Sequence, residues 1–179
     1  MFMRSIQNSC LIQSIQMRTD LSQATFIIPI RIESSDRMRN VITTTAFLLE
    51  NFKTNIIIKE VDKKSIFERE ALPILEDILD VDLWENFNFI FEESDEPLFH
   101  RQRVLNEMIM ECETDIVVNY DCDVILPKES YELAYKGIRD NIYDVVYPYG
   151  QGMYQKQVAA TDITAVSYTH LTLPTKRIV

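Results

Sequence analysis

The chain has 179 residues, of which 46% are hydrophobic and 26% are charged, as is typical of a single globular domain. Its formal net charge of −10 at pH 7 argues against nucleic-acid phosphate as the main partner. No apolar run reaches the roughly 18 residues of a membrane span, so no transmembrane segment is expected. With no anchor visible, we expect a cytoplasmic protein whose three cysteines are reduced thiols.

Five strands and four helices are predicted in alternation. Short β-branched apolar runs predict the strands, and apolar residues that recur every three or four positions predict the helices. A Ser65-x-x-Glu68 capping box opens the second helical region, which Pro73 is expected to interrupt, with a restart over 74–79. The predicted strands cover residues 24–30, 55–61, 88–91, 116–118 and 143–148. The predicted helices cover residues 36–52, 65–79, 98–112 and a stretch that begins at Pro127.

This alternation predicts an α/β fold with a mostly parallel, Rossmann-like sheet and flanking helices. Ligands of such sheets bind beyond the carboxyl ends of the strands, where the strand order reverses. The chain has only three glycines, so it contains neither a Gly-x-Gly-x-x-Gly loop nor a P-loop. A phosphate site would therefore need a cation and polar side chains in place of a glycine-rich cradle.

Asp121 and Asp123 follow the predicted strand at 116–118, which has the sequence of a strand covered on both faces. In extended backbone, residues two apart project to the same side, so both carboxylates could reach one point while Cys122 faces away. Paired carboxylate oxygens suit Mg²⁺ or Mn²⁺, which could in turn grip a diphosphate. The alternative is that both are ordinary acids at a strand-to-turn junction.

Other polar side chains are expected at the carboxyl ends of the first two strands. Arg31 follows Pro29 at the end of the first strand, and Glu60 and Asp62 close the second. Arg31 could instead be a solvated loop cation, and the two acids could be ordinary residues of a strand end.

The segment 26–31, with its Pro29-x-Arg31, resembles the opening of the GT-A glycosyltransferases, notably the family 2-like, galactosyltransferase-like and chondroitin-polymerase-like branches. Arg103-x-x-Asn106 and Asp121-x-Asp123 are similar to two further motifs of those enzymes and occur in the same order. The resemblance covers about residues 24–150. It implies the donor-binding half of a nucleotide-diphospho-sugar transferase fold, incomplete in this chain.

The resemblance also implies roles for these residues. Asp123 would bind Mn²⁺ or Mg²⁺ at the diphosphate of a nucleotide-sugar donor, in most members a UDP-sugar. Asp121 would share the metal or contact the donor. Arg31 and Glu60 would lie near the nucleoside, with Pro29 and Asp62 beside them. Arg103 and Asn106 would form the wall at the donor sugar, although Arg103 could instead pair with Glu107 along its helix.

The implied activity is transfer of a hexose or N-acetylhexosamine to a glycan or other acceptor, with the catalytic base expected beyond residue 150 in a longer parent. Residues 1–23 are expected to be a loose leader, 24–150 the nucleotide-sugar domain, and 151–179 a truncated end. The tail from about residue 166 resembles translated sequencing adaptor. Two alternatives remain: a non-catalytic α/β module such as a phosphoacceptor receiver, and a sugar-1-phosphate nucleotidyltransferase.

Overall fold

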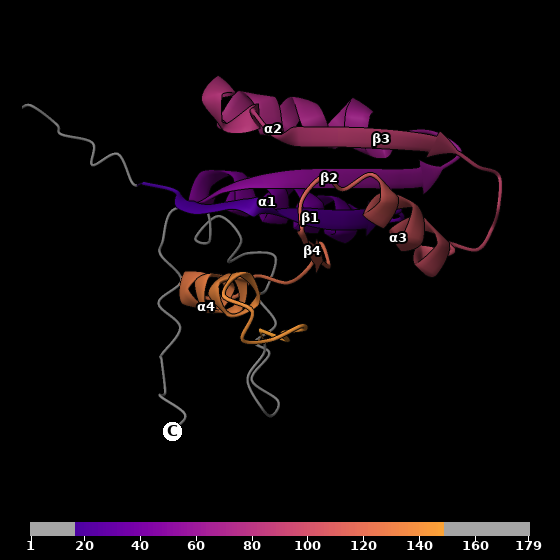
Figure 1. Cartoon of the computed structure of the whole chain (residues 1–179). Helices are drawn as coiled ribbons and strands as arrows, with labels where there is room; N and C mark the ends of the chain where they lie inside the picture. The colour runs from indigo at the N-terminus through magenta and orange to yellow at the C-terminus, as the bar shows by residue number, and fades with distance from the viewer. Residues whose placement is uncertain (1–16, 149–179) are drawn as a thin grey trace, which may run out of the picture.

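The computed structural model describes residues 17–148, drawn in colour in Figure 1. Strands and helices alternate along this part of the chain. The strands are β1 (Thr19–Ile30), β2 (Phe52–Asp62), β3 (Phe87–Glu93) and β4 (Ile116–Asn119). The helical segments are α1 (Ser35–Asn51), the π-helical η1 (Phe67–Ala71), α2 (Leu72–Ile78), the 3₁₀-helical η2 (Val81–Trp84), α3 (Arg101–Met110) and α4 (Lys128–Arg139).

The four strands form one parallel sheet in the order β3-β2-β1-β4, which confirms the predicted α/β class. The chain adds β2 and then β3 on one side of β1, and afterwards crosses to the other side of β1 to add β4. The strand order therefore reverses between β1 and β4. Figure 1 shows the arrowheads of β1, β2 and β3 pointing toward the same end of the molecule.

Two helical layers cover the sheet, and alternation along β1 determines which residues face each layer. Phe26, Ile28 and Ile30 are buried in one cluster with side chains from α1, α2 and α4. Ile27 and Ile57 face the opposite side, where they pack against Val104, Leu105 and Met108 of α3. Burial on both faces explains why β1 and β2 have nearly continuous apolar runs.

Two predictions about the later strands are wrong. β4 is not covered on both faces: Val117 is 37% exposed, and among the described residues β4 pairs with β1 alone and lies at the edge of the sheet. Residues 143–148, predicted to be a fifth strand, have no strand conformation. Tyr143, Val145 and Tyr147 in that segment are 59–79% exposed, so the apolar pattern there does not report burial against the described residues.

Pro73 does not break its helix, contrary to the prediction. The π-helical turn η1 precedes α2, and Leu72 N–H bonds the carbonyl of Phe67 five residues earlier. In an α-helix the proline ring would meet the carbonyl four residues before it. The wider π turn gives that ring room, so helical backbone continues from η1 into α2.

Several boundaries also differ from the predictions. β1 begins at Thr19, so part of the expected leader at 1–23 is strand. α3 begins at Arg101 and not near residue 98. Residues 1–16 and 149–179, with the expected truncated end and foreign tail, lie outside the described residues.

Candidate functional site

The acidic pair lies at the point where the strand order reverses. Tyr120 N–H bonds the Ile27 carbonyl at 3.1 Å, which extends the pairing of β4 with β1 by one residue. A turn then follows at 121–124, closed by a bond from Val124 N–H to the Asp121 carbonyl at 3.4 Å. The expectation of extended backbone across the pair is therefore wrong. The turn still leaves Asp121 and Asp123 exposed while Cys122 packs against the core.

Cys122 lies between the two acids as a neutral thiol. Burial, followed by the negative charge of Asp123, raises the pKa of this thiol to about 11. A thiol with such a pKa carries almost no thiolate at neutral pH, so Cys122 is suited to packing against the core and not to acting as a nucleophile.

Asp121 forms an ion pair with Arg101, which is not among the expected site residues. Arg101, the first residue of α3, places Nη2 2.6 Å from Asp121 Oδ1 and 3.1 Å from Asn119 Oδ1. Asp123 has no hydrogen bond or ion pair with any residue of 17–148. Arg101 is the first residue of α3, which begins later than the sequence predicts, and no local pattern of the sequence indicates its contact with Asp121.

Arg31 is almost fully buried at the carboxyl end of β1. Its Nε donates to the Val61 carbonyl at 2.8 Å, Nη1 donates to the Pro97 carbonyl at 3.2 Å, and the guanidinium lies 5.5 Å from the centroid of the Phe99 ring. No carboxylate among the described residues forms an ion pair with it. Arg31 therefore brings a positive charge to this end of the sheet and fixes the segment that leads into Arg101.

Pro29 occupies a position in β1 where its missing N–H has no cost. Ile27, two residues earlier, directs its carbonyl toward β4. Backbone groups two residues apart in a strand point to the same side, so the nitrogen of Pro29 also faces the β4 side. The ladder with β4 ends at Ile27, so Pro29 is not paired with a residue of β4 and its missing N–H removes no bond of that ladder.

Glu60 is fully buried, and its contacts are structural. Its carboxylate accepts bonds from Ser65 Oγ at 2.7 Å and from the backbone N–H groups of Ile66 and Phe67. Burial raises the pKa of Glu60 even though these bonds act in the opposite direction. Asp62 is half-buried and accepts a bond from the next residue's N–H at 2.7 Å.

Arg103 belongs to an ion-pair network that docks α3 on the sheet. It lies 2.7 Å from Glu92 of β3 and 2.7 Å from Glu107 of α3, and Lys59 of β2 contacts the same two acids at 2.9 and 2.6 Å. The helical pair with Glu107, given above as the alternative for Arg103, is thus present. Asn106 is exposed and has no hydrogen bond with the described residues.

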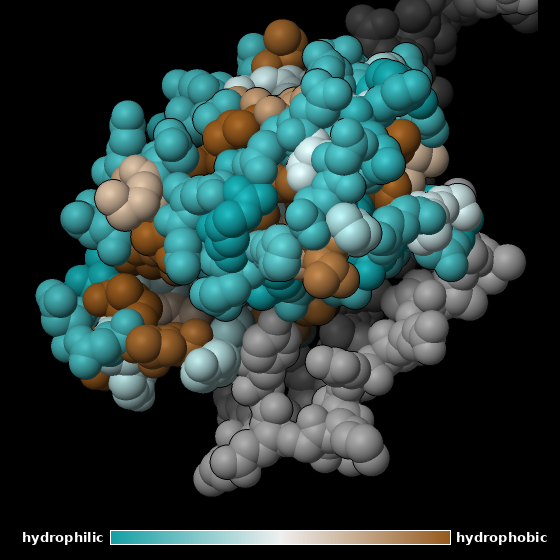
Figure 2. All heavy atoms as spheres, turned by 90° about the vertical axis from the view of Figure 1, so that its right-hand side faces the viewer, coloured by the Kyte–Doolittle hydropathy of each residue, from teal (hydrophilic) through white to brown (hydrophobic). Residues whose placement is uncertain are grey.

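A cavity of about 270 Å³ opens at the carboxyl end of the sheet, beside the loop after β1. Residues 32–35 form one wall with Met38 of α1, and Ile66 and Glu70 form the other. Figure 2 views the molecule from the side toward which the arrowheads of Figure 1 point. This face is largely hydrophilic, with apolar side chains gathered toward its lower left.

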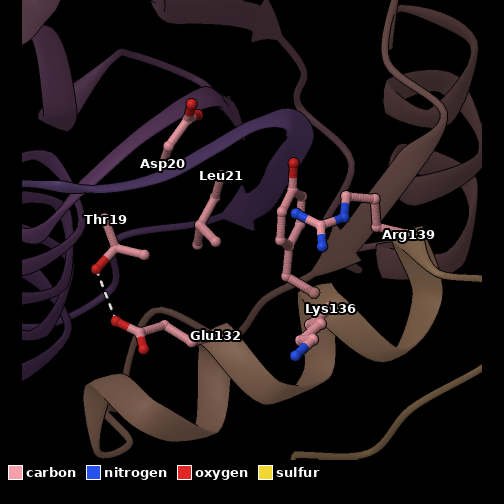
Figure 3. A pocket seen from close by; sticks show the side chains of 7 residues that line it. Thr19, Asp20, Leu21, Glu132, Lys136 and Arg139 are labelled. Atoms are coloured by element: carbon pink, nitrogen blue, oxygen red, sulfur yellow. Dashed lines mark hydrogen bonds between the residues drawn. The ribbon is translucent and has the colours of Figure 1, made fainter.

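A second cavity, of about 250 Å³, lies at the opposite end of β1 and is far from the acidic pair in the fold. Figure 3 shows the side chains of Lys136 and Arg139 of α4 on one side of this cavity and the first residues of β1 on the other. A 2.7 Å hydrogen bond from Thr19 of β1 to Glu132 of α4 joins the two elements. The cations and acids of the cavity are exposed to solvent, and the cavity contains none of the predicted site residues.

No protein-family model matches the chain, and no curated protein sequence does either. Within residues 17–148 there is no cluster of three or more His, Cys, Asp or Glu side chains that could hold a metal. None of the helices in that range is both long and apolar enough to cross a membrane.

Proposed function

We propose that this chain is the nucleotide-sugar-binding part of a GT-A glycosyltransferase. The observation that carries the proposal is an exposed acidic pair, Asp121 and Asp123, at the point where the strand order of a parallel sheet reverses, with Arg101 bound to Asp121. A protein with a net charge of −10 repels a diphosphate over most of its surface. The cations at this edge, together with a divalent metal, would reverse that field locally.

The residues present fit a divalent cation that keeps part of its shell for water and phosphate. Asp123 is exposed and has no partner among the described residues, and Asp121 is bound by Arg101 through Oδ1 only. Mg²⁺ and Mn²⁺ at phosphate sites commonly use one or two protein carboxylates. When bound, the metal would supply Lewis-acid stabilisation of the departing diphosphate.

One arginine would meet the donor, and a second would support it from within the fold. Arg101, which binds Asp121, would take the donor contact that the resemblance implies for Arg103, because Arg103 is held by Glu92 and Glu107. Its guanidinium can bind two phosphate oxygens at once. Arg31 supports this wall through Pro97 and Phe99, since the segment between them leads directly into α3.

The nucleoside would occupy the cavity beside the loop after β1. Ile32, Met38 and Ile66 provide apolar walls for a base, and Glu33 and Ser35 provide polar groups at the rim. Transfer of a hexose or N-acetylhexosamine from a UDP-sugar to a glycan would then be the reaction of the whole enzyme, in which this chain binds the donor.

The test is titration of UDP and GDP into the protein with and without Mn²⁺. We expect nucleotide binding that requires Mn²⁺ and is lost in Asp123→Ala. Asp115→Ala is the matched control, because Asp115 is also an exposed aspartate but lies before β4, at the other end of that strand. Nucleotide binding that does not require the metal, or that survives in Asp123→Ala, would contradict the proposal and favour another α/β module.

A further inference from the structure

The loop that carries the acidic pair is bound from beneath by three buried hydroxyl groups. Thr44 of α1 donates to the Cys122 carbonyl at 2.7 Å, Tyr120 donates to the Val124 carbonyl at 2.5 Å, and the hydroxyl of Tyr131 on α4 accepts from Leu126 N–H at 3.0 Å. We call these three side chains the hydroxyl clamp. Together they hold the loop backbone at three alternate residues.

The two tyrosines of the clamp form a directed chain of hydrogen bonds. Their hydroxyl oxygens lie 2.5 Å apart. Each tyrosine has one O–H proton, and that of Tyr120 goes to Val124, so Tyr131 is the donor in the pair. The chain thus runs from Leu126 N–H through both hydroxyls to the Val124 carbonyl, an arrangement in which each bond polarises the next.

Close packing prevents the clamp from relaxing. Thr44, Tyr120 and Tyr131 are at most 5% exposed. The Tyr120 ring packs edge-on against Phe26 of β1 at 5.4 Å, and the Tyr131 ring lies 5.0 Å from Phe52 at the start of β2. The clamp therefore connects the loop to α1, α4 and the central strands at once.

We propose that the hydroxyl clamp positions Asp121 and Asp123 for the divalent cation, an inference that rests on the proposed function. Apart from the exposed ion pair between Arg101 and Asp121, the loop has little other support: β4 pairing ends at Tyr120, and the turn itself is closed by a single long bond of 3.4 Å. Partners behind metal ligands orient the ligand atoms, and losing them weakens metal binding by about 10–100-fold. Thr44 and Tyr131 are therefore positioning residues that touch neither metal nor donor.

Thr44 and its neighbour Thr45 form a matched pair for the test. Both are buried on α1, but the Thr45 hydroxyl has no hydrogen bond among the described residues. Thr44→Val and Thr45→Val each replace a hydroxyl by a methyl group at adjacent positions. Thr44→Ser keeps the hydroxyl and removes only the methyl group. Tyr131→Phe removes the other end of the clamp while keeping the ring.

The measurement is Mn²⁺ binding in the presence of UDP, followed by electron paramagnetic resonance, with hydrogen exchange of the 122–126 amides. We expect Thr44→Val and Tyr131→Phe to bind Mn²⁺ about 10-fold more weakly and to exchange these amides faster, with β1 amides still protected. Thr45→Val and Thr44→Ser are expected to behave like the unmodified chain in both measurements.

Two results would overturn the inference, and they are distinguishable. Unchanged Mn²⁺ affinity in Thr44→Val and Tyr131→Phe, with binding still lost in Asp123→Ala, would remove the clamp's role and leave the proposed function standing. Failure of the unmodified chain to bind Mn²⁺ with UDP, with Asp123→Ala no different, would remove both.

Discussion

Arg101 Nη2 lies 2.6 Å from Asp121 Oδ1, which joins the start of α3 to the acidic turn after β4. The two side chains are 41% and 55% exposed, and a pair this exposed contributes only about 0–1 kcal/mol to stability. A ligand could therefore replace either partner at small cost. Asp121 suits the metal and Arg101 suits the diphosphate, and the first prediction tests the role of Arg101.

Arg101→Met is expected to weaken Mn²⁺-dependent UDP binding by about 10-fold, because it removes one charge-assisted phosphate contact worth roughly 1.5–3 kcal/mol. Its free energy of unfolding should change by less than about 0.5 kcal/mol, as for other exposed side chains. Isothermal titration calorimetry and urea unfolding would measure the two quantities.

Arg103→Met is the control for that substitution, since Arg103 is similarly exposed but its partners are Glu92 and Glu107. Nucleotide affinity should be unchanged in this variant. If Arg103→Met lost nucleotide binding and Arg101→Met did not, the assignment of Arg101 to the donor would be wrong.

The network of Lys59, Glu92, Arg103 and Glu107 predicts an acid-sensitive docking of α3. Hydrogen bonds from the two cations lower the pKa of both acids. The bond from Arg103 has the largest effect on the pKa of Glu92, and the bond from Lys59 has the largest effect on that of Glu107. The folded pKa values lie below the usual 4.5, so the stability these acids contribute is complete above about pH 4.5 and lost as the pH falls through the folded values.

Lys59→Met should therefore flatten the dependence of unfolding free energy on pH below about pH 4.5. It should raise the pKa of Glu107 more than Arg103→Met does, whereas Arg103→Met should raise that of Glu92 more. Titration of the carboxyl carbons by nuclear magnetic resonance would separate the two effects. Equal shifts at both acids in both variants would contradict this ranking of the two cations.

Glu60→Ala is expected to destabilise the fold by about 2–4 kcal/mol, because it leaves the N–H groups of Ile66 and Phe67 and the Ser65 hydroxyl without their buried acceptor. Because burial raises the pKa of Glu60, its ionisation opposes stability as the pH rises above 4.5, the reverse of Glu92 and Glu107. Urea unfolding of the variant measures the loss. A change below 1 kcal/mol would contradict the capping role.

Gly137→Ala tests the contact between α4 and the segment after it. A Cβ at Gly137 would lie 2.9 Å from Cδ2 of Tyr143, so the exposed tyrosine ring would have to move. Alanine favours a helix over glycine by about 1 kcal/mol, and we expect this gain to be offset in the single variant. In a Tyr143→Ala background the same change should stabilise by about 0.5–1 kcal/mol in thermal unfolding. Equal effects in both backgrounds would rule out the contact.

The sequence by itself determined the α/β alternation, the approximate position of each described strand, and the acids after β4. These features depend on local periodicity and on residue types at strand ends, which the chain carries without reference to its packing. The same local reasoning failed at 143–148, where an apolar run is exposed, and at Pro73, where a π turn absorbs the proline.

Only the tertiary structure decided which side chains meet. It placed β4 at the edge of the described sheet, brought Arg101 to Asp121, turned Arg103 toward Glu92, and buried Glu60 beneath a helix start. The spacing of apolar residues along one helix or strand does not say how a neighbouring helix or strand is aligned with it. Contacts between different elements depend on that alignment, so they follow from packing of the whole sheet and its helices.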